Sequence, residues 1–149
     1  MSELKAKINE SVKAAMRAGD KARLGTLRLI SAALKQREID ERIELTDADV
    51  LEILSRMVKQ RRESISHYEQ AGRHELAARE QAEIDIISEF LPEPLSAAEL
   101  DALIDQAIAD TGAASMRDMG KVMGHLRPRI QGRADPAVVS ARVKQRLSG

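Results

Sequence analysis

The chain has 149 residues, of which 43% are apolar, and its 24 Lys/Arg balance 24 Asp/Glu. The absence of cysteine excludes a disulfide framework, a thiolate nucleophile and a cysteine zinc site. Only Tyr68 and Phe90 are aromatic, so the core must be aliphatic, which favours an all-α fold. No apolar run approaches the roughly 18 residues of a membrane span, and we expect a cytoplasmic protein.

Charge is distributed unevenly along the chain. Residues 1–73 carry 15 Lys/Arg and 12 Asp/Glu, residues 74–110 carry 1 and 10, and residues 111–149 carry 8 and 2. A basic C-terminal end is a candidate surface for polyanions, whereas the acidic middle of the chain is a poor one.

The N-terminal part of the chain has apolar residues at helical spacing almost throughout. Ser2 and Gly19 are the expected start and end of a first helix, and a second helix begins at Asp20. The segment 38–45 is charged and aperiodic, so we expect the second helix to fray there into a connection.

Two more helices are predicted before the first proline. Thr46 and Asp49 have the spacing of a capping pair for a long third helix, which Gly72 ends. A fourth helix is expected from about His74 to Phe90.

The stretch LPEPLS, residues 91–96, is the best candidate for a domain boundary. Pro92 and Pro94 each lack a backbone N–H and restrict the residue before them, so a helix does not continue through them. We therefore predict an N-terminal helical domain of about four helices, residues 1–93, and a small three-helix tail domain, residues 94–149.

The tail has recognisable helix starts and stops. Ser96 and Glu99 form a capping-box pattern for the fifth helix. The sixth helix is expected to begin near Ser115 and to stop at Pro128, and Asp135 is the expected N-cap of the last.

Common catalytic motifs do not occur in the sequence, which has no GxGxxG, P-loop, HExxH or GxSxG pattern. Glu63 and His67 lie four residues apart and could present two metal ligands, although a solvated pair explains them as well. We expect no metal site, no cofactor and no catalytic residue in this chain.

Positive charge is concentrated in the tail. Lys121, Arg127, Arg129 and Arg133 fall within thirteen residues, with the last two expected in a flexible loop bounded by glycine and proline. Because the tail lacks aromatic residues for base stacking, any nucleic-acid contact is expected to be made to the backbone.

A possible second basic surface involves Arg28, Lys35 and Arg62, which lie off the apolar stripes of their helices. The alternative is that these side chains are solvated or pair with the acidic fourth helix. Arg61, in contrast, falls within the apolar stripe of the third helix, and a buried pair with Glu80 or Glu83 is predicted.

Gly120 and Gly124 share one face of the predicted sixth helix. Each costs about 1 kcal/mol relative to alanine inside a helix, so the pair implies a compensating gain. Two sources of this gain are considered. One is the close approach of a neighbouring helix, and the other is the close approach of an RNA backbone.

Three stretches together resemble the GatB/YqeY family, specifically a stand-alone YqeY-like protein. They are LRLISAALKQREID from Leu27, VKQRRESISHYEQAGRHELAAREQAEIDIISEFLPEPLS from Val58 to Ser96, and SMRDMGKVMGHLRPRIQGRAD from Ser115. The resemblance covers essentially the whole chain and implies an all-α fold. The chain is also similar to the C-terminal region of the glutamine-dependent aminoacyl-tRNA amidotransferase B subunit, which helps to hold tRNA.

The resemblance implies tRNA as a partner and an association with carbon–nitrogen ligase activity that uses glutamine as the amido-N-donor. It places Gly120 and Lys121 where the family presents its helix to tRNA, with Gly132 and Arg133 beside them. Nothing in this chain matches the ATP-dependent portion of that subunit, so the predicted function is a tRNA-binding accessory module without its own catalysis. The alternative is an adaptor that docks a protein partner through the acidic fourth helix or the face of Gly120 and Gly124.

Overall fold

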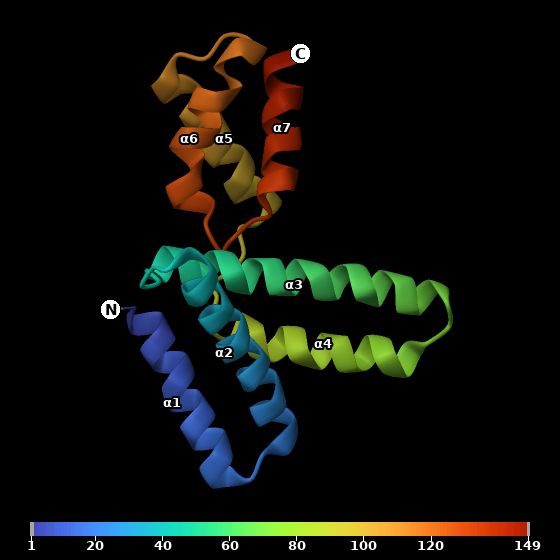
Figure 1. The fold of residues 1–149 in the computed structure, drawn as a ribbon. Coiled ribbons are helices and arrows are strands. Elements are labelled where there is room, and N and C mark those ends of the chain that lie inside the picture. The colour runs from blue at the N-terminus through green and yellow to red at the C-terminus, as the bar shows by residue number, and fades with distance from the viewer. Residues whose placement is uncertain (1, 149) are drawn as a thin grey trace. The chain divides into compact units, whose positions relative to one another are not determined.

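A computed structural model describes residues 2–148, which form seven α-helices and one short 3-10 turn and contain no strand (Figure 1). The helices group into two compact units, residues 1–92 and residues 93–149. The all-α prediction is confirmed, with four helices among the described residues of the first unit and three in the second. None of the described helices combines the length and apolar character needed to cross a membrane.

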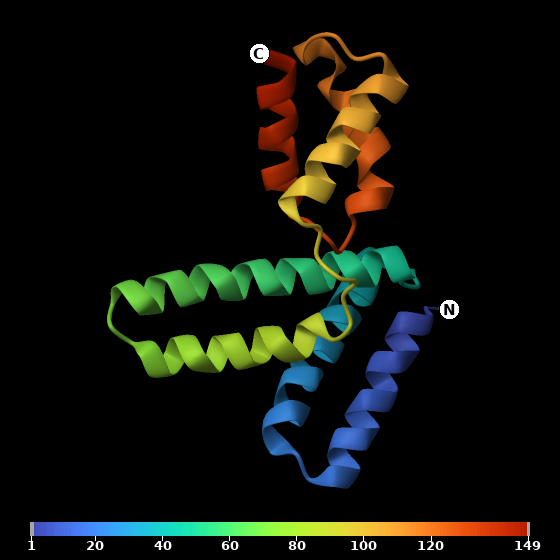
Figure 2. The same cartoon turned by 180° about the vertical axis from the view of Figure 1, so that it is seen from behind.

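The first unit consists of two helical hairpins. Helices α1 (Glu3–Ala18) and α2 (Lys21–Glu41) form one, and α3 (Asp47–Gln70) and α4 (His74–Ser88) form the other (Figures 1 and 2). Aliphatic side chains from all four helices fill the core between the hairpins, as expected for a chain with so few aromatic residues. The fully buried ones include Ile8, Leu27, Ile30, Leu34, Val50, Leu54 and Ile87.

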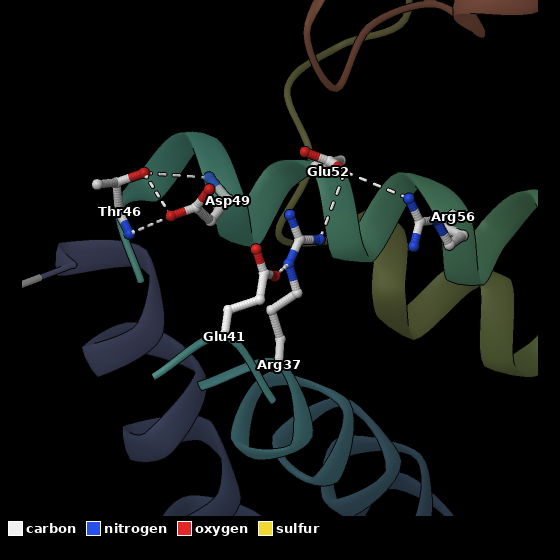
Figure 3. Close-up of polar contacts among 6 residues, drawn as sticks. All are labelled: Arg37, Glu41, Thr46, Asp49, Glu52 and Arg56. Carbon is white, nitrogen blue, oxygen red and sulfur yellow. Dashed lines mark hydrogen bonds and ion pairs between the residues drawn. The ribbon is translucent and has the colours of Figure 1, made fainter. Parts of the chain in front are cut away.

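The predicted helix starts of this unit are confirmed by hydrogen bonds. Ser2 Oγ accepts from the backbone N–H of Lys5 at 3.0 Å, and an Asp20 carboxylate oxygen accepts from the backbone N–H of Arg23 at 3.1 Å. Thr46 and Asp49 form a reciprocal capping box at the start of α3 (Figure 3).

The expected fraying of α2 from residue 38 is wrong, because the helix continues to Glu41. Arg37 explains the extension: it forms ion pairs with Glu41 in the next turn and with Glu52 of α3, the latter at 3.4 Å (Figure 3). Glu52 also pairs with Arg56 at 3.3 Å. These contacts hold the last turn of α2 against α3, so the segment is helical without apolar periodicity.

The predicted pair of Arg61 is confirmed. Its Nε lies 2.8 Å from Glu83 Oε2 and 4.0 Å from Glu80 Oε2, and its Nη1 donates to the carbonyl of Met57 at 3.2 Å. Only 14% of the Arg61 side chain is exposed, so the charge is largely buried between α3 and α4. Helix α4 ends at Ser88, slightly earlier than predicted.

The second unit is a bundle of α5 (Ala97–Thr111), α6 (Met119–Ile130) and α7 (Pro136–Ser148), with the 3-10 turn Met116–Asp118 leading into α6. The bundle has its own aliphatic core. The fully buried side chains of this core are Ile104, Ala107, Val122, Leu126, Ile130, Val139 and Val143.

Helix starts in the second unit agree with the sequence, but the predicted end of α6 does not. Ser96 and Glu99 form the expected capping box, and an Asp135 carboxylate oxygen accepts from the N–H of Ala137 at 3.0 Å. Helix α6, however, continues through Pro128 to Ile130. Ile130 is buried in the core, so its packing favours one more turn although proline removes a backbone donor.

Candidate nucleic-acid interface

The solvent-facing side of α6 is a narrow strip without side chains that project far. Gly120, Gly124 and Pro128 follow one another at intervals of four residues, which places them on one helix face, and all three are exposed. The buried face of the same helix carries Val122, Leu126 and Ile130. We call the first three residues the α6 strip.

The two glycines of the α6 strip have no close neighbour among the described residues. A Cβ built on Gly120 or Gly124 meets no atom within 4 Å outside the helix's own local backbone. No other helix among the described residues therefore approaches these glycines closely. The first of the two explanations considered from the sequence does not account for them. Each glycine costs the helix about 1 kcal/mol of stability relative to alanine, and packing among the described residues does not offset this cost.

Pro128 also affects the backbone of the strip. In an α-helix, residue 128 would donate its N–H to the carbonyl of Gly124, and proline has no N–H to donate. The carbonyl oxygen of Gly124 therefore lacks its usual helical donor. From the sequence, Pro128 is predicted only to end the helix, although its spacing from Gly120 and Gly124 already places it on their helix face.

Two cations flank the α6 strip, and a third lies in the last turn of α6. Lys121 and Arg127 are each three or four residues from a member of the strip, a spacing that makes them its neighbours on the helix surface. Lys121, Arg127 and Arg129 are all exposed, and among the described residues none of them forms a salt bridge. Arg129 is part of helix α6, so its predicted place in a loop is wrong.

Arg133 lies in the short connection between α6 and α7 and is tied to the start of the unit. Its Nε donates to the carbonyl of Glu93 at 2.8 Å, and its carbonyl accepts from Leu95 N at 2.9 Å. Glu99 lies 3.7 Å from its guanidinium. Gly132 has φ +75°, a left-handed conformation that favours glycine. The expected flexible loop is therefore a hydrogen-bonded turn.

The basic residues of α7 differ in whether they already pair with a carboxylate. Arg142 pairs with Asp101 of α5 at 2.6 Å, and Arg146 pairs with Asp105. Lys144 is exposed and forms no salt bridge with a described residue. The positive excess of residues 111–149 is thus partly neutralised by the acidic α5, and the cations without a salt bridge are concentrated on α6.

Asp118 and Asp110 hold the two ends of the turn that precedes α6. The carboxylate of Asp118 accepts from the N–H groups of Ala114 at 2.9 Å and Ser115 at 3.3 Å. These backbone hydrogen bonds, with a smaller contribution from nearby Lys121, lower the pKa of Asp118. His125 on α6 lies 3.2 Å from Asp110 at the end of α5.

The possible second basic surface is divided between two helices. Arg28 and Lys35 are seven residues apart and exposed on α2, whereas Arg62 is exposed on α3. No described residue forms a salt bridge with any of the three. Arg28 and Lys35 thus share a helix face, and their role stays a prediction.

The pair Glu63 and His67 lies on exposed turns of α3. Among residues 2–148 no group of three or more metal-ligating side chains comes together.

Comparison with known proteins identifies the family to which this sequence is similar. The sequence profile of the family described as Yqey-like protein matches residues 5–147. "Altered inheritance of mitochondria protein 41, mitochondrial" of Pyrenophora tritici-repentis is 28% identical, covering 93% of this chain and 78% of that protein. The protein of the same name from Eremothecium gossypii is 36% identical, covering 63% of this chain and 52% of its own length.

An uncharacterized protein of Schizosaccharomyces pombe is 29% identical over 62% of this chain and 76% of its own length. The chain therefore spans between about half and three quarters of these relatives. The match of the family profile to nearly every residue agrees with the resemblance found in the sequence. The chain belongs to the YqeY-like (GatB/YqeY) family.

Proposed function

We propose that this protein is a tRNA-binding accessory module, related to tRNA-dependent amidotransferase, that uses α6 to contact the RNA backbone. The observation that carries the proposal is the α6 strip, with two glycines open to solvent and flanked by Lys121 and Arg127. Glycines inside a helix lower its stability, and these two pack against no neighbour that would offset the loss. Contacts with an RNA backbone that approaches them closely would offset it.

The chemistry of the strip suits phosphate and ribose more than bases. Lysine and arginine supply positive charge and N–H donors for phosphate oxygens. The carbonyl of Gly124, which receives no N–H from residue 128, can accept a hydrogen bond from a 2′-hydroxyl. The second unit has no Phe, Tyr or Trp side chain on which a base could stack. Recognition by the shape and backbone of a folded RNA follows from this combination.

The proposal assigns no catalytic step to this chain. Family association with glutamine-dependent carbon–nitrogen ligase activity supports a role beside such an enzyme, as a module that holds or presents tRNA. We propose the cytoplasm as the compartment, whereas the fungal relatives are named as mitochondrial.

Binding of uncharged tRNA at several salt concentrations tests this function. Lys121→Ala, Arg127→Ala and Arg129→Ala should each weaken binding and reduce the slope of log K against log salt concentration by roughly one. Lys144→Ala is a matched control, because it removes an exposed cation from α7. If saturable tRNA binding is absent even at low salt, the proposal is wrong.

A protein partner on the same strip is the second candidate, and the open glycines favour it equally on steric grounds. Gly120→Leu and Gly124→Leu would block a partner helix as well as RNA, so the two candidates need different readouts. Retention of a protein partner after nuclease treatment, with loss in the leucine variants, would favour the adaptor over the RNA-binding module.

A further inference from the structure

Helix α2 has a solvent-facing side that its role in the first unit does not explain. Leu29 and Ile39 are 47% and 60% exposed, although residues of this kind are usually buried. Gly25 and Ala32 lie on the same side, at helical spacings from them, and a Cβ on Gly25 would meet no atom within 4 Å. The side therefore presents two large apolar residues next to small ones, which leaves room for another helix.

The same side of α2 is basic. Lys21, Arg28 and Lys35 follow one another at intervals of seven residues, and all three are exposed. None of them forms a salt bridge with a described residue. An RNA backbone would use these cations but would leave Leu29 and Ile39 in water. A protein surface that is acidic and lined by small residues would use both sets.

This chain carries such a surface on α4. Ala78 and Ala82 are exposed at its outer side, and the exposed Glu75 and Asp85 lie at helical spacings from them. Glu89, just after the helix, is not part of this surface, because its carboxylate pairs with Arg23 of α2 in the same chain at 2.7 Å. Glu75 and Asp85 are ten residues apart, which is about 15 Å of helix, and Arg28 and Lys35, about 10 Å apart along α2, fall within that length.

We propose that two copies of this chain associate by docking the basic apolar side of α2 on one copy against the acidic alanine side of α4 on the other. Both sides belong to the first unit, so a two-fold axis would form the contact twice, as in most homodimers. Leu29 and Ile39 pack on the alanines of α4, and the cations of α2 lie beside its carboxylates.

The size of these surfaces sets the strength of the dimer. A helix side about 15 Å long and about 10 Å wide covers roughly 150 Å², and four of them give roughly 600 Å². Stable interfaces bury about 1,200–2,000 Å². The dimer is therefore weak and concentration-dependent, with a dissociation constant in the micromolar range or above, and added salt weakens it further.

Sedimentation equilibrium of the full chain from about 10 μM to 1 mM tests the proposal, with a charge-swap design. The basic-side variant Arg28→Glu/Lys35→Glu and the acidic-side variant Glu75→Lys/Asp85→Lys should each associate at least tenfold more weakly than the unmodified chain. An equimolar mixture of the two variants should regain association, because acid then faces base in both contacts. Circular dichroism confirms that each variant is folded.

Ile39→Glu tests the apolar part of the contact at a position so exposed that folding should not suffer, and it should also weaken association at least tenfold. Lys121→Glu on α6 is the control and should leave association unchanged. A monomer at 1 mM and low salt, or a mixture of variants that stays monomeric, would overturn the proposal. Loss of tRNA binding in the basic-side variant with unchanged self-association would assign this side of α2 to RNA instead.

Discussion

Arg142 on α7 lies 2.6 Å from Asp101 on α5, and this ion pair separates the basic residues of the second unit into two kinds. Cations that face α5 already have a carboxylate partner, whereas those on the outer side of α6, together with Arg117 and Lys144, form no salt bridge with a described residue. Only the second kind is available to a polyanion without breaking an existing pair. The local net charge of the sequence does not make this distinction.

Replacement of a paired cation should therefore affect RNA binding less than replacement of an unpaired one. Arg142→Ala should weaken tRNA binding less than Arg127→Ala, because a polyanion must first displace Asp101. The loss of stability in Arg142→Ala should stay below about 1 kcal/mol, since the pair is partly exposed. Parallel titrations in the same buffer check the order, and equal losses of affinity would contradict it.

Alanine at the α6 strip should stabilise the protein and weaken its binding. Gly120→Ala and Gly124→Ala each remove a helix-interior glycine where a Cβ meets nothing, so unfolding should become harder by about 0.5–1 kcal/mol. Urea denaturation measures the gain, and tRNA titration measures the expected loss of affinity. Gly112→Ala is the control: with φ +66°, alanine there should destabilise. A gain in stability without any loss of tRNA affinity would remove the glycines from the proposed interface.

Arg61 should be important for stability, unlike its sequence neighbour Arg62. Arg61→Ala leaves Glu83 and Glu80 without their buried partner, and we expect a loss of about 1–3 kcal/mol in the free energy of unfolding. Arg61→Met should lose less because it keeps the packing volume. Arg62→Ala, at an exposed position, should stay within about 0.5 kcal/mol of the unmodified chain. Similar urea midpoints for Arg61→Ala and Arg62→Ala would show that the pair is not a stabilising contact.

Stability should fall in acid because several helix caps use carboxylates. Hydrogen bonds from the backbone and side chain of Ser96 lower the pKa of Glu99, and backbone N–H groups lower the pKa of Asp118. Side-chain and backbone hydrogen bonds at the helix starts likewise lower the pKa of Asp47 and of Asp49.

A carboxylate whose pKa is lower in the folded state contributes stability that is complete above its unfolded pKa and is lost as the pH falls through its folded pKa. The urea midpoint should therefore decrease between about pH 5 and pH 2. Glu99→Gln and Asp118→Asn should flatten this decrease while lowering the midpoint at pH 7. A midpoint that rises on acidification would contradict the assignment.

The sequence predicted most helix starts correctly because capping depends on neighbouring residues. The pairs at Thr46 and Asp49 and at Ser96 and Glu99 are three residues apart, and their hydrogen bonds form within one turn. Helix ends were predicted less well. Helix α2 is prolonged by Arg37, which pairs with Glu52 of another helix, and α6 is prolonged past Pro128 by the burial of Ile130. Both effects are tertiary contacts that no local pattern contains.

The sequence by itself determined the all-α class, the core of aliphatic residues, the pairing of Arg61 with a carboxylate of the fourth helix and the family. Helical periodicity, a charge within an apolar stripe and the order of motifs can all be read from the local spacing of residues. The tertiary structure alone decided which charges and glycines are available. Arg133 and Arg142 found partners on distant segments, whereas Gly120 and Gly124 found none among the described residues. Pairing and packing depend on which helices meet, and that is settled only when the chain folds.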